Sequence, residues 1–128
     1  MSDLVERPVL IPARRLAAPI ILGFLLIAIA WYVRRSYIEP EQIAFACDTN
    51  PWVGWCAARM LAIQTFVTMG LGWVAIVSGG MAVCFGSRAM AWIAWLVGCL
   101  GLVWYCYEFA AVGALAGLTV LVRKLSQR

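Results

Sequence analysis

Two cysteines near the middle of the sequence are the residues best placed to do chemistry. Cys47 and Cys56 lie nine positions apart, on either side of Asn50-Pro51, a pair typical of a helix cap followed by proline in the first turn. In an oxidising compartment, two cysteines this close persist as a disulfide, which would fix the preceding loop to the start of the helix. We therefore expect a structural Cys47–Cys56 disulfide.

Redox catalysis is the alternative chemistry for this pair, as in a membrane thiol-disulfide oxidoreductase that passes electrons from a partner to a quinone. Such a relay needs a second pair of cysteines within reach. The sequence has no Cys-x-x-Cys motif, and only Cys106 is expected as a third thiol on the same side. Cys84 and Cys99 are interpreted as small apolar packing residues. The structural disulfide is the preferred interpretation, and a pair of free thiols is the other alternative.

Histidine is absent from the sequence. Without imidazole, haem ligation by histidine, histidine-based zinc sites and histidine acid-base catalysis are excluded. We expect no catalytic residue, no metal and no cofactor.

Two charged side chains, Arg59 and Glu108, lie close to apolar sequence. Arg59 follows Trp55 by four positions, so the two share a helix face on which the guanidinium can stack on the indole or reach lipid headgroups. We expect Arg59 and Glu108 to form an ion pair. A ligand or ion site is the alternative for these residues.

Three polar side chains inside apolar sequence lie together: Gln64, Thr65 and Thr68. Their structural interpretation is hydrogen bonding across helices or to carbonyl groups of their own helix. The functional alternative is a polar cavity on a substrate path. No carboxylate lies in the middle of an apolar segment, which argues against a proton-coupled carrier.

The elements that must position these residues are apolar segments long enough to cross a bilayer. Of the 128 residues, 65% are hydrophobic and 12% are charged, which is outside the range of soluble globular domains. The pattern predicts an all-α integral membrane protein, a compact single-domain bundle of four transmembrane helices with short loops. The predicted spans are 16–33, 51–78, 89–105 and 109–123. An alternative topology makes 89–122 a shallow hairpin that leaves the bilayer on the side it entered.

Three sequence signals bear on the ends of these spans. Arg14 and Arg15, followed by apolar residues and Ala28-Ile29-Ala30, imitate a secretory signal peptide. The apolar run continues to Val33, so we expect an uncleaved first span. Residues 36–50 are predicted to form the one long loop. Ser78-Gly79-Gly80 and Gly86-Ser87-Arg88 are predicted to bracket the turn after the second span.

Lysine and arginine residues predict the orientation of the bundle. With both termini inside, seven lie on the cytoplasmic side and three outside. The seven are Arg7, Arg14, Arg15, Arg88, Arg123, Lys124 and Arg128, and the three are Arg34, Arg35 and Arg59. This excess favours a bacterial-type inner membrane with both termini cytoplasmic. The net charge of +4 comes from short basic clusters, which fit anionic lipid headgroups and not nucleic acid.

Gly113 and Gly117 form a Gly-x-x-x-Gly spacing that lets two helix backbones approach closely in lipid. This stripe would pack on the second helix of the same chain, which has Gly70 and Gly72, or on another chain.

From these features we expect a small non-catalytic accessory, assembly or anchoring subunit of a larger inner-membrane complex. Its predicted partners are the lipid bilayer and a second membrane protein or further copies of the chain. A small oligomeric transporter or flippase is the alternative, in which Gln64, Thr68 and Glu108 would face a common cavity. The thiol-disulfide oxidoreductase is the third candidate.

Overall fold

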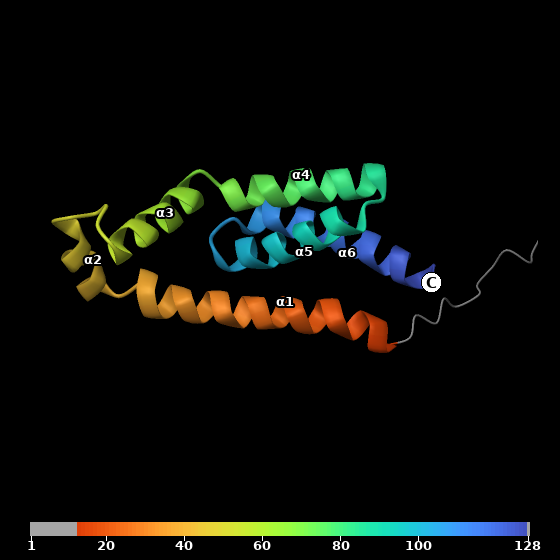
Figure 1. Cartoon of the computed structure of the whole chain (residues 1–128), viewed down its shortest axis with the longest axis horizontal. Helices are drawn as coiled ribbons and strands as arrows, with labels where there is room; N and C mark the ends of the chain where they lie inside the picture. Colours follow the sequence, from red (N-terminus) through yellow and green to blue (C-terminus); the bar gives the residue numbers. More distant parts are fainter. Residues whose placement is uncertain (1–12, 128) are drawn as a thin grey trace, which may run out of the picture.

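The chain is entirely helical in the part that the computed structural model describes, residues 13–127 (Figure 1). The elements are α1 (Ala13–Val33), the π-helical turn η1 (Arg34–Ile38), α2 (Glu41–Asp48), α3 (Trp55–Val67), α4 (Gly70–Phe85), α5 (Arg88–Val103) and α6 (Tyr107–Ser126). Within the described range no strand occurs, so the predicted helical class is confirmed. The predicted cytoplasmic tail with Arg7, and the terminal Arg128, lie outside the described residues.

Two helices are long and apolar enough to cross a membrane. One runs from Arg14 to Ile38, because η1 continues α1 without a break, and the other is α6. The α3–α4 pair passes the same test only as one broken span, bent by 60°, which raises the number to three. The helix α5, with 16 residues, is shorter than an ordinary span.

The predicted continuous helix over 51–78 is wrong. Its start lies at Trp55, after a turn in which Gly54 has a φ of 56°, and it breaks after Thr68, where Met69 is left-handed with a φ of 52°. The Thr68 hydroxyl and the Thr68 amide both donate to the carbonyl oxygen of Gln64. The Met69 amide then donates to the carbonyl oxygen of Phe66, three residues back, and the chain changes direction at the left-handed Met69.

Two further boundaries differ from the prediction. Ser78-Gly79-Gly80 lies inside α4, which ends only at Phe85. The turn into α5 consists of Gly86, with a φ of 61°, and Ser87, whose hydroxyl accepts from the Met90 amide as the N-cap of α5. Gly79 is buried because the α6 backbone at Gly113 comes close to it, so this glycine serves helix packing and not a turn. The predicted loop over 36–50 is largely helical, since it contains the end of η1 and all of α2.

The helices α4, α5 and α6 pack on one another in pairs and form the core (Figure 1). Most of its buried residues are small, among them Ala75, Ala82, Ala91, Ala94, Ala110 and Ala114, and Leu121 is the large side chain buried with them. The helix α1 lies outside this core and packs mainly on α5. There the Trp95 indole donates to the Pro19 carbonyl oxygen at 2.8 Å and its ring covers Gly23. The core is therefore a three-helix unit with α1 attached along one side.

Charge is distributed unequally between the two ends of this bundle. We call the end with the start of α1, the α4–α5 turn and the end of α6 the basic end (Figure 1). Within the described residues it has five cations and no acid: Arg14, Arg15, Arg88, Arg123 and Lys124. We call the opposite end, with η1, α2, α3 and the α5–α6 turn, the disulfide end. It carries three cations, Arg34, Arg35 and Arg59, and four acids, Glu39, Glu41, Asp48 and Glu108.

Candidate functional site

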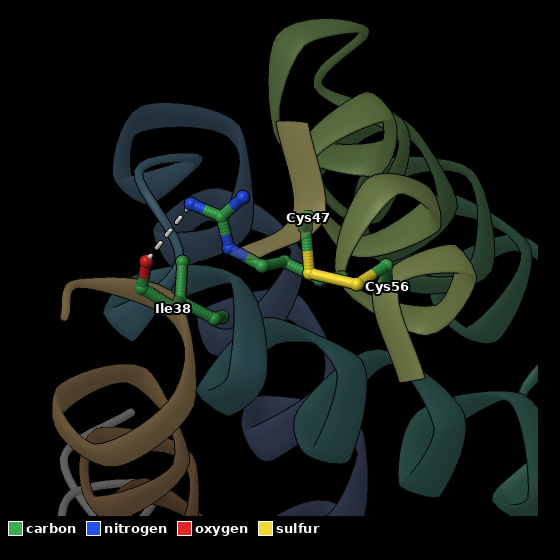
Figure 2. The surroundings of a disulfide bond; sticks show 4 residues. Ile38, Cys47 and Cys56 are labelled. Carbon is green, nitrogen blue, oxygen red and sulfur yellow. Dashed lines mark hydrogen bonds between the residues drawn. A yellow bond between two sulfur atoms is a disulfide. The ribbon is translucent and has the colours of Figure 1, made fainter. Parts of the chain in front are cut away.

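A disulfide joins the short helix α2 to the first turn of α3. It links Cys47 to Cys56, whose Cα atoms are 5.4 Å apart (Figure 2). Cys47 is buried, and the chain reverses between the two cysteines through the turn that ends at Gly54. The disulfide therefore holds α2 against α3 in place of an extensive packing interface.

Arg34 connects the end of α1 to the α5–α6 turn. Its Nε donates to a carboxylate oxygen of Glu39 at 2.9 Å, and its Nη1 donates to the carbonyl oxygen of Val103 at 2.7 Å. Its Nη2 donates to the Tyr105 hydroxyl, and the guanidinium lies 4.0 Å from the centre of the Tyr105 ring. Because charged donors make the stronger hydrogen bonds, this network is the main polar link between η1 and the core.

Glu39 lies between two arginines. The hydrogen bond from Arg34, followed by that from Arg35, lowers the pKa of the Glu39 carboxyl below its ordinary value. The Arg35 bond is longer, at 3.3 Å, and the Arg35 side chain is largely exposed. The ionised carboxylate thus orients Arg34 toward the α5–α6 turn.

Arg59 lies one helical turn after Cys56 and lines a cavity of about 170 Å³ between η1 and α3. The other lining residues are Val33, Tyr37, Ile38, Trp55, Ala58, Ala62 and Trp104. One guanidinium nitrogen, Nη2, donates to the Ile38 carbonyl oxygen at 3.4 Å, the bond drawn in Figure 2. Its Nε is fully covered and, within the described residues, has no hydrogen-bond partner. The cavity therefore holds a cationic donor inside a largely aromatic wall.

The predicted ion pair between Arg59 and Glu108 is not formed in the described part of the chain. The 60° bend at Met69 directs α3 toward η1, whereas Glu108 is exposed in the first turn of α6. Glu108 lines a different, smaller hollow together with Met69 and Tyr107. The two charges are separated because the predicted straight helix, which would have brought them to the same level, is bent.

The predicted polar cavity of Gln64, Thr65 and Thr68 is also not assembled. The Thr65 and Thr68 hydroxyls donate at 2.8 Å to carbonyl oxygens of their own helix, at Leu61 and Gln64. The Gln64 and Thr68 side chains are exposed and do not converge with Glu108. Thr65 and Thr68 thus bond to carbonyl groups of their own helix, which was one of the two structural interpretations.

Gly113 and Gly117 lie inside the chain's own bundle. A Cβ atom at Gly113 would come within 2.4 Å of the Ala75 carbonyl group on α4, and one at Gly117 within 2.7 Å of the Ala91 carbonyl oxygen on α5. Both glycines are buried. Of the two alternatives for this stripe, the structure shows packing within the chain, and Ala75 is the contact where Gly70 had been expected.

Sequence reasoning did not find the long-range partners of this end of the molecule. It had no signal for Val103 or Tyr105 as partners of Arg34, because both lie about 70 positions away. Similarly, the aromatic wall around Arg59 combines residues from η1, α3 and the end of α5. Among residues 13–127, no group of three or more cysteine, aspartate and glutamate side chains is arranged to hold a metal ion.

Neither known protein families, nor characterised proteins, nor solved structures provide a match for this chain. The candidate site therefore consists of three features of the chain itself, a disulfide, an arginine network and a cationic aromatic cavity. All three lie at one end of the helical bundle.

Proposed function

We propose that the chain is a small subunit of a bacterial-type inner membrane that works by association, as an accessory, assembly or anchoring component of a larger complex. In this proposal α1, the bent α3–α4 pair, α5 and α6 are the four spans. Both termini are cytoplasmic, because the basic end carries cations without acids among the described residues. The disulfide then faces the oxidising side, where such bonds persist.

The observation that carries the proposal is the contrast between the inside and the outside of the core. Inside, glycine and alanine bring the backbones of α4, α5 and α6 into contact, as at Gly98, where a Cβ atom would lie 2.6 Å from that of Ala114. Close packing of this kind favours a rigid scaffold over a solute path through one chain. The outward face of α4 instead carries large apolar side chains, which suit lipid or another membrane protein.

An apolar groove between α4 and α5 is the proposed contact for the partner. Its volume is about 390 Å³, and it is lined by Trp73, Val74, Val77, Ser78, Met81, Met90 and Ile93. A Val77→Trp substitution should fill the groove and release the partner. Leu115→Trp, which adds the same ring to an exposed position on α6, is the matched control.

The deciding experiment is purification of the tagged chain in a mild detergent. A larger membrane protein that co-purifies in fixed ratio, and is lost with Val77→Trp but not with Leu115→Trp, would support the subunit. A homo-oligomer without other proteins would favour the transporter or flippase and overturn the proposal.

Topology is tested separately with a membrane-impermeant thiol reagent on spheroplasts, in a Cys84→Ser background that removes the exposed native thiol. A cysteine at Glu41 should react and one at Gln127 should not. Labelling at both positions would replace four spans by an odd number.

A further inference from the structure

We propose that the cavity around Arg59 is a binding site for an amphiphile, in which the guanidinium holds an oxyanion headgroup and the aromatic wall holds the start of an aliphatic chain. This site goes beyond the proposed association. It lies at the disulfide end, away from the α4–α5 groove.

The first reason is the unsatisfied guanidinium. Buried polar groups in folded proteins nearly always have a hydrogen-bond partner, and a guanidinium offers five donors. Arg59 makes one side-chain hydrogen bond in the described residues, from Nη2 at 3.4 Å, which is beyond the usual length of such bonds. Its Nε is fully covered by the protein, so a ligand would bind the terminal guanidinium nitrogens. An oxyanion is the group that matches a guanidinium in charge and in planar geometry.

The second reason is that the nearby carboxylates are engaged or turned elsewhere. Glu39 accepts from Arg34 and Arg35, and Glu108 is exposed at the start of α6. Glu41 and Asp48 form no ion pair with Arg59 among the described residues. The carbonyl oxygen of Ile38 is the acceptor that the chain itself supplies to Arg59. A ligand must therefore bring the negative charge.

The third reason is the size and chemistry of the remaining wall. A cavity of about 170 Å³ is close to the ~150 Å³ space that accommodates a benzene-sized body. Its wall has Tyr37 and Trp55 in edge-to-face contact at 5.5 Å, and Trp104 from the end of α5. Such a wall accepts methylene groups, so the ligand combines a charge with an apolar chain, as a fatty carboxylate or an alkyl phosphate does.

The fourth reason is that the walls are already held in place. The disulfide ends one turn before Arg59, and the Arg34 network ties η1 to the α5–α6 turn. A preformed site loses little freedom when a ligand binds. The cavity is therefore built to receive a ligand without rearrangement.

The test measures thermal stability of the purified chain in a non-ionic detergent during separate titrations with octanoate, octyl phosphate, octanol and inorganic phosphate. At least one of the two anionic amphiphiles should raise the melting temperature in a saturable way, whereas octanol, with the same chain length and no charge, should not. Arg59→Met should weaken the binding by about ten- to a hundredfold, the range expected for loss of hydrogen bonds to a charged group. Arg35→Met removes an exposed charge outside the cavity and should leave binding unchanged.

A second variant covers the case in which Arg59→Met does not fold. Ala62→Leu fills part of the cavity, leaves Arg59 in place and should also abolish the response. Equal stabilisation by octanol, or an unchanged response in Arg59→Met, would overturn the site. Stabilisation by inorganic phosphate alone, without a response to either amphiphile, would overturn the role of the aliphatic chain. Because the purified chain is used without a partner, failure here leaves the association proposal standing, and the reverse also holds.

Discussion

The core and the disulfide end of this protein are held together in different ways. In the core, α4, α5 and α6 touch through glycine and alanine, and an added Cβ atom at Gly98, Gly101 or Gly113 would come within 2.6 Å of a neighbouring helix. At the disulfide end, α2, α3 and η1 are connected by one disulfide and by arginine side chains. Close packing leaves no room for a ligand, whereas a few directional links leave a cavity with a cation in it.

This difference indicates a division of labour. In the core, glycine and alanine bring the helices into contact, and no ion pair or disulfide lies there among the described residues. The links at the disulfide end respond to reduction, charge removal and acid, and they surround the cavity around Arg59. Four predictions test this contrast.

Enlarging a core glycine should have the largest effect. Gly113→Leu places a side chain where the Ala75 backbone already lies 2.4 Å from a Cβ atom, and a backbone cannot turn away as a flexible side chain can. The expected loss of stability is about 3 kcal/mol, at the upper end of overpacking effects. Gly80→Leu on α4, which meets nothing within 4 Å, should stay within about 0.5 kcal/mol. Thermal unfolding in detergent measures both, and equal effects would contradict the assigned core.

Removing the disulfide should have the next largest effect. Replacing Cys47 and Cys56 together by serine releases a short loop and should lower stability by about 2 to 3 kcal/mol on the chain-entropy model. Limited proteolysis should then cut near Gly54 while the core stays intact. Cys84→Ser is the matched control. Alkylation of both cysteines in the untreated protein would show that the bond does not form.

Loosening the arginine network should have a smaller effect. Arg34→Gln removes the charged donor to Val103 and Glu39, and the expected loss is about 1 to 2 kcal/mol. Arg35→Gln loses an exposed contact and should lower stability by only about a few tenths of a kcal/mol. Proteolysis at the α5–α6 turn should increase in the first variant only. Equal losses of stability and equal cleavage in Arg34→Gln and Arg35→Gln would mean that Arg34 does not hold α1 to the core.

Acid should have the smallest effect, through Glu39. Because the pKa of Glu39 is lowered in the folded protein by Arg34 and then Arg35, its ionised form adds stability above the ordinary pKa of 4.5. That contribution is lost as the pH falls below 4.5 through the folded pKa. The difference in melting temperature between wild type and Glu39→Gln should therefore narrow over this range. A constant difference for Glu39→Gln would exclude a role for its charge.

Much of the helical content could be predicted from local sequence. The bounds of α1, α5 and α6 lie within a few residues of the predicted spans, because long uncharged runs favour helix wherever they are placed. The break at Met69 was missed because a left-handed methionine has no signal in the local sequence, and Gly70, which follows it, was assigned to a continuous helix. Gly79 was taken for a turn because sequence alone does not distinguish a glycine in a turn from one beneath a neighbouring helix.

Sequence by itself determined that this is a helical, strongly apolar chain with uneven charge and a suitably spaced cysteine pair, since hydropathy, charge and spacing are properties of consecutive residues. Only the tertiary structure decided which residues meet. It put Gly113 and Gly117 against the chain's own helices, separated Arg59 from Glu108, and surrounded Arg59 with residues from α1, η1, α3 and the end of α5. The physical reason is that contact depends on distances set by helix bends and packing angles, so one 60° bend changes every partner of α3 without changing its local sequence.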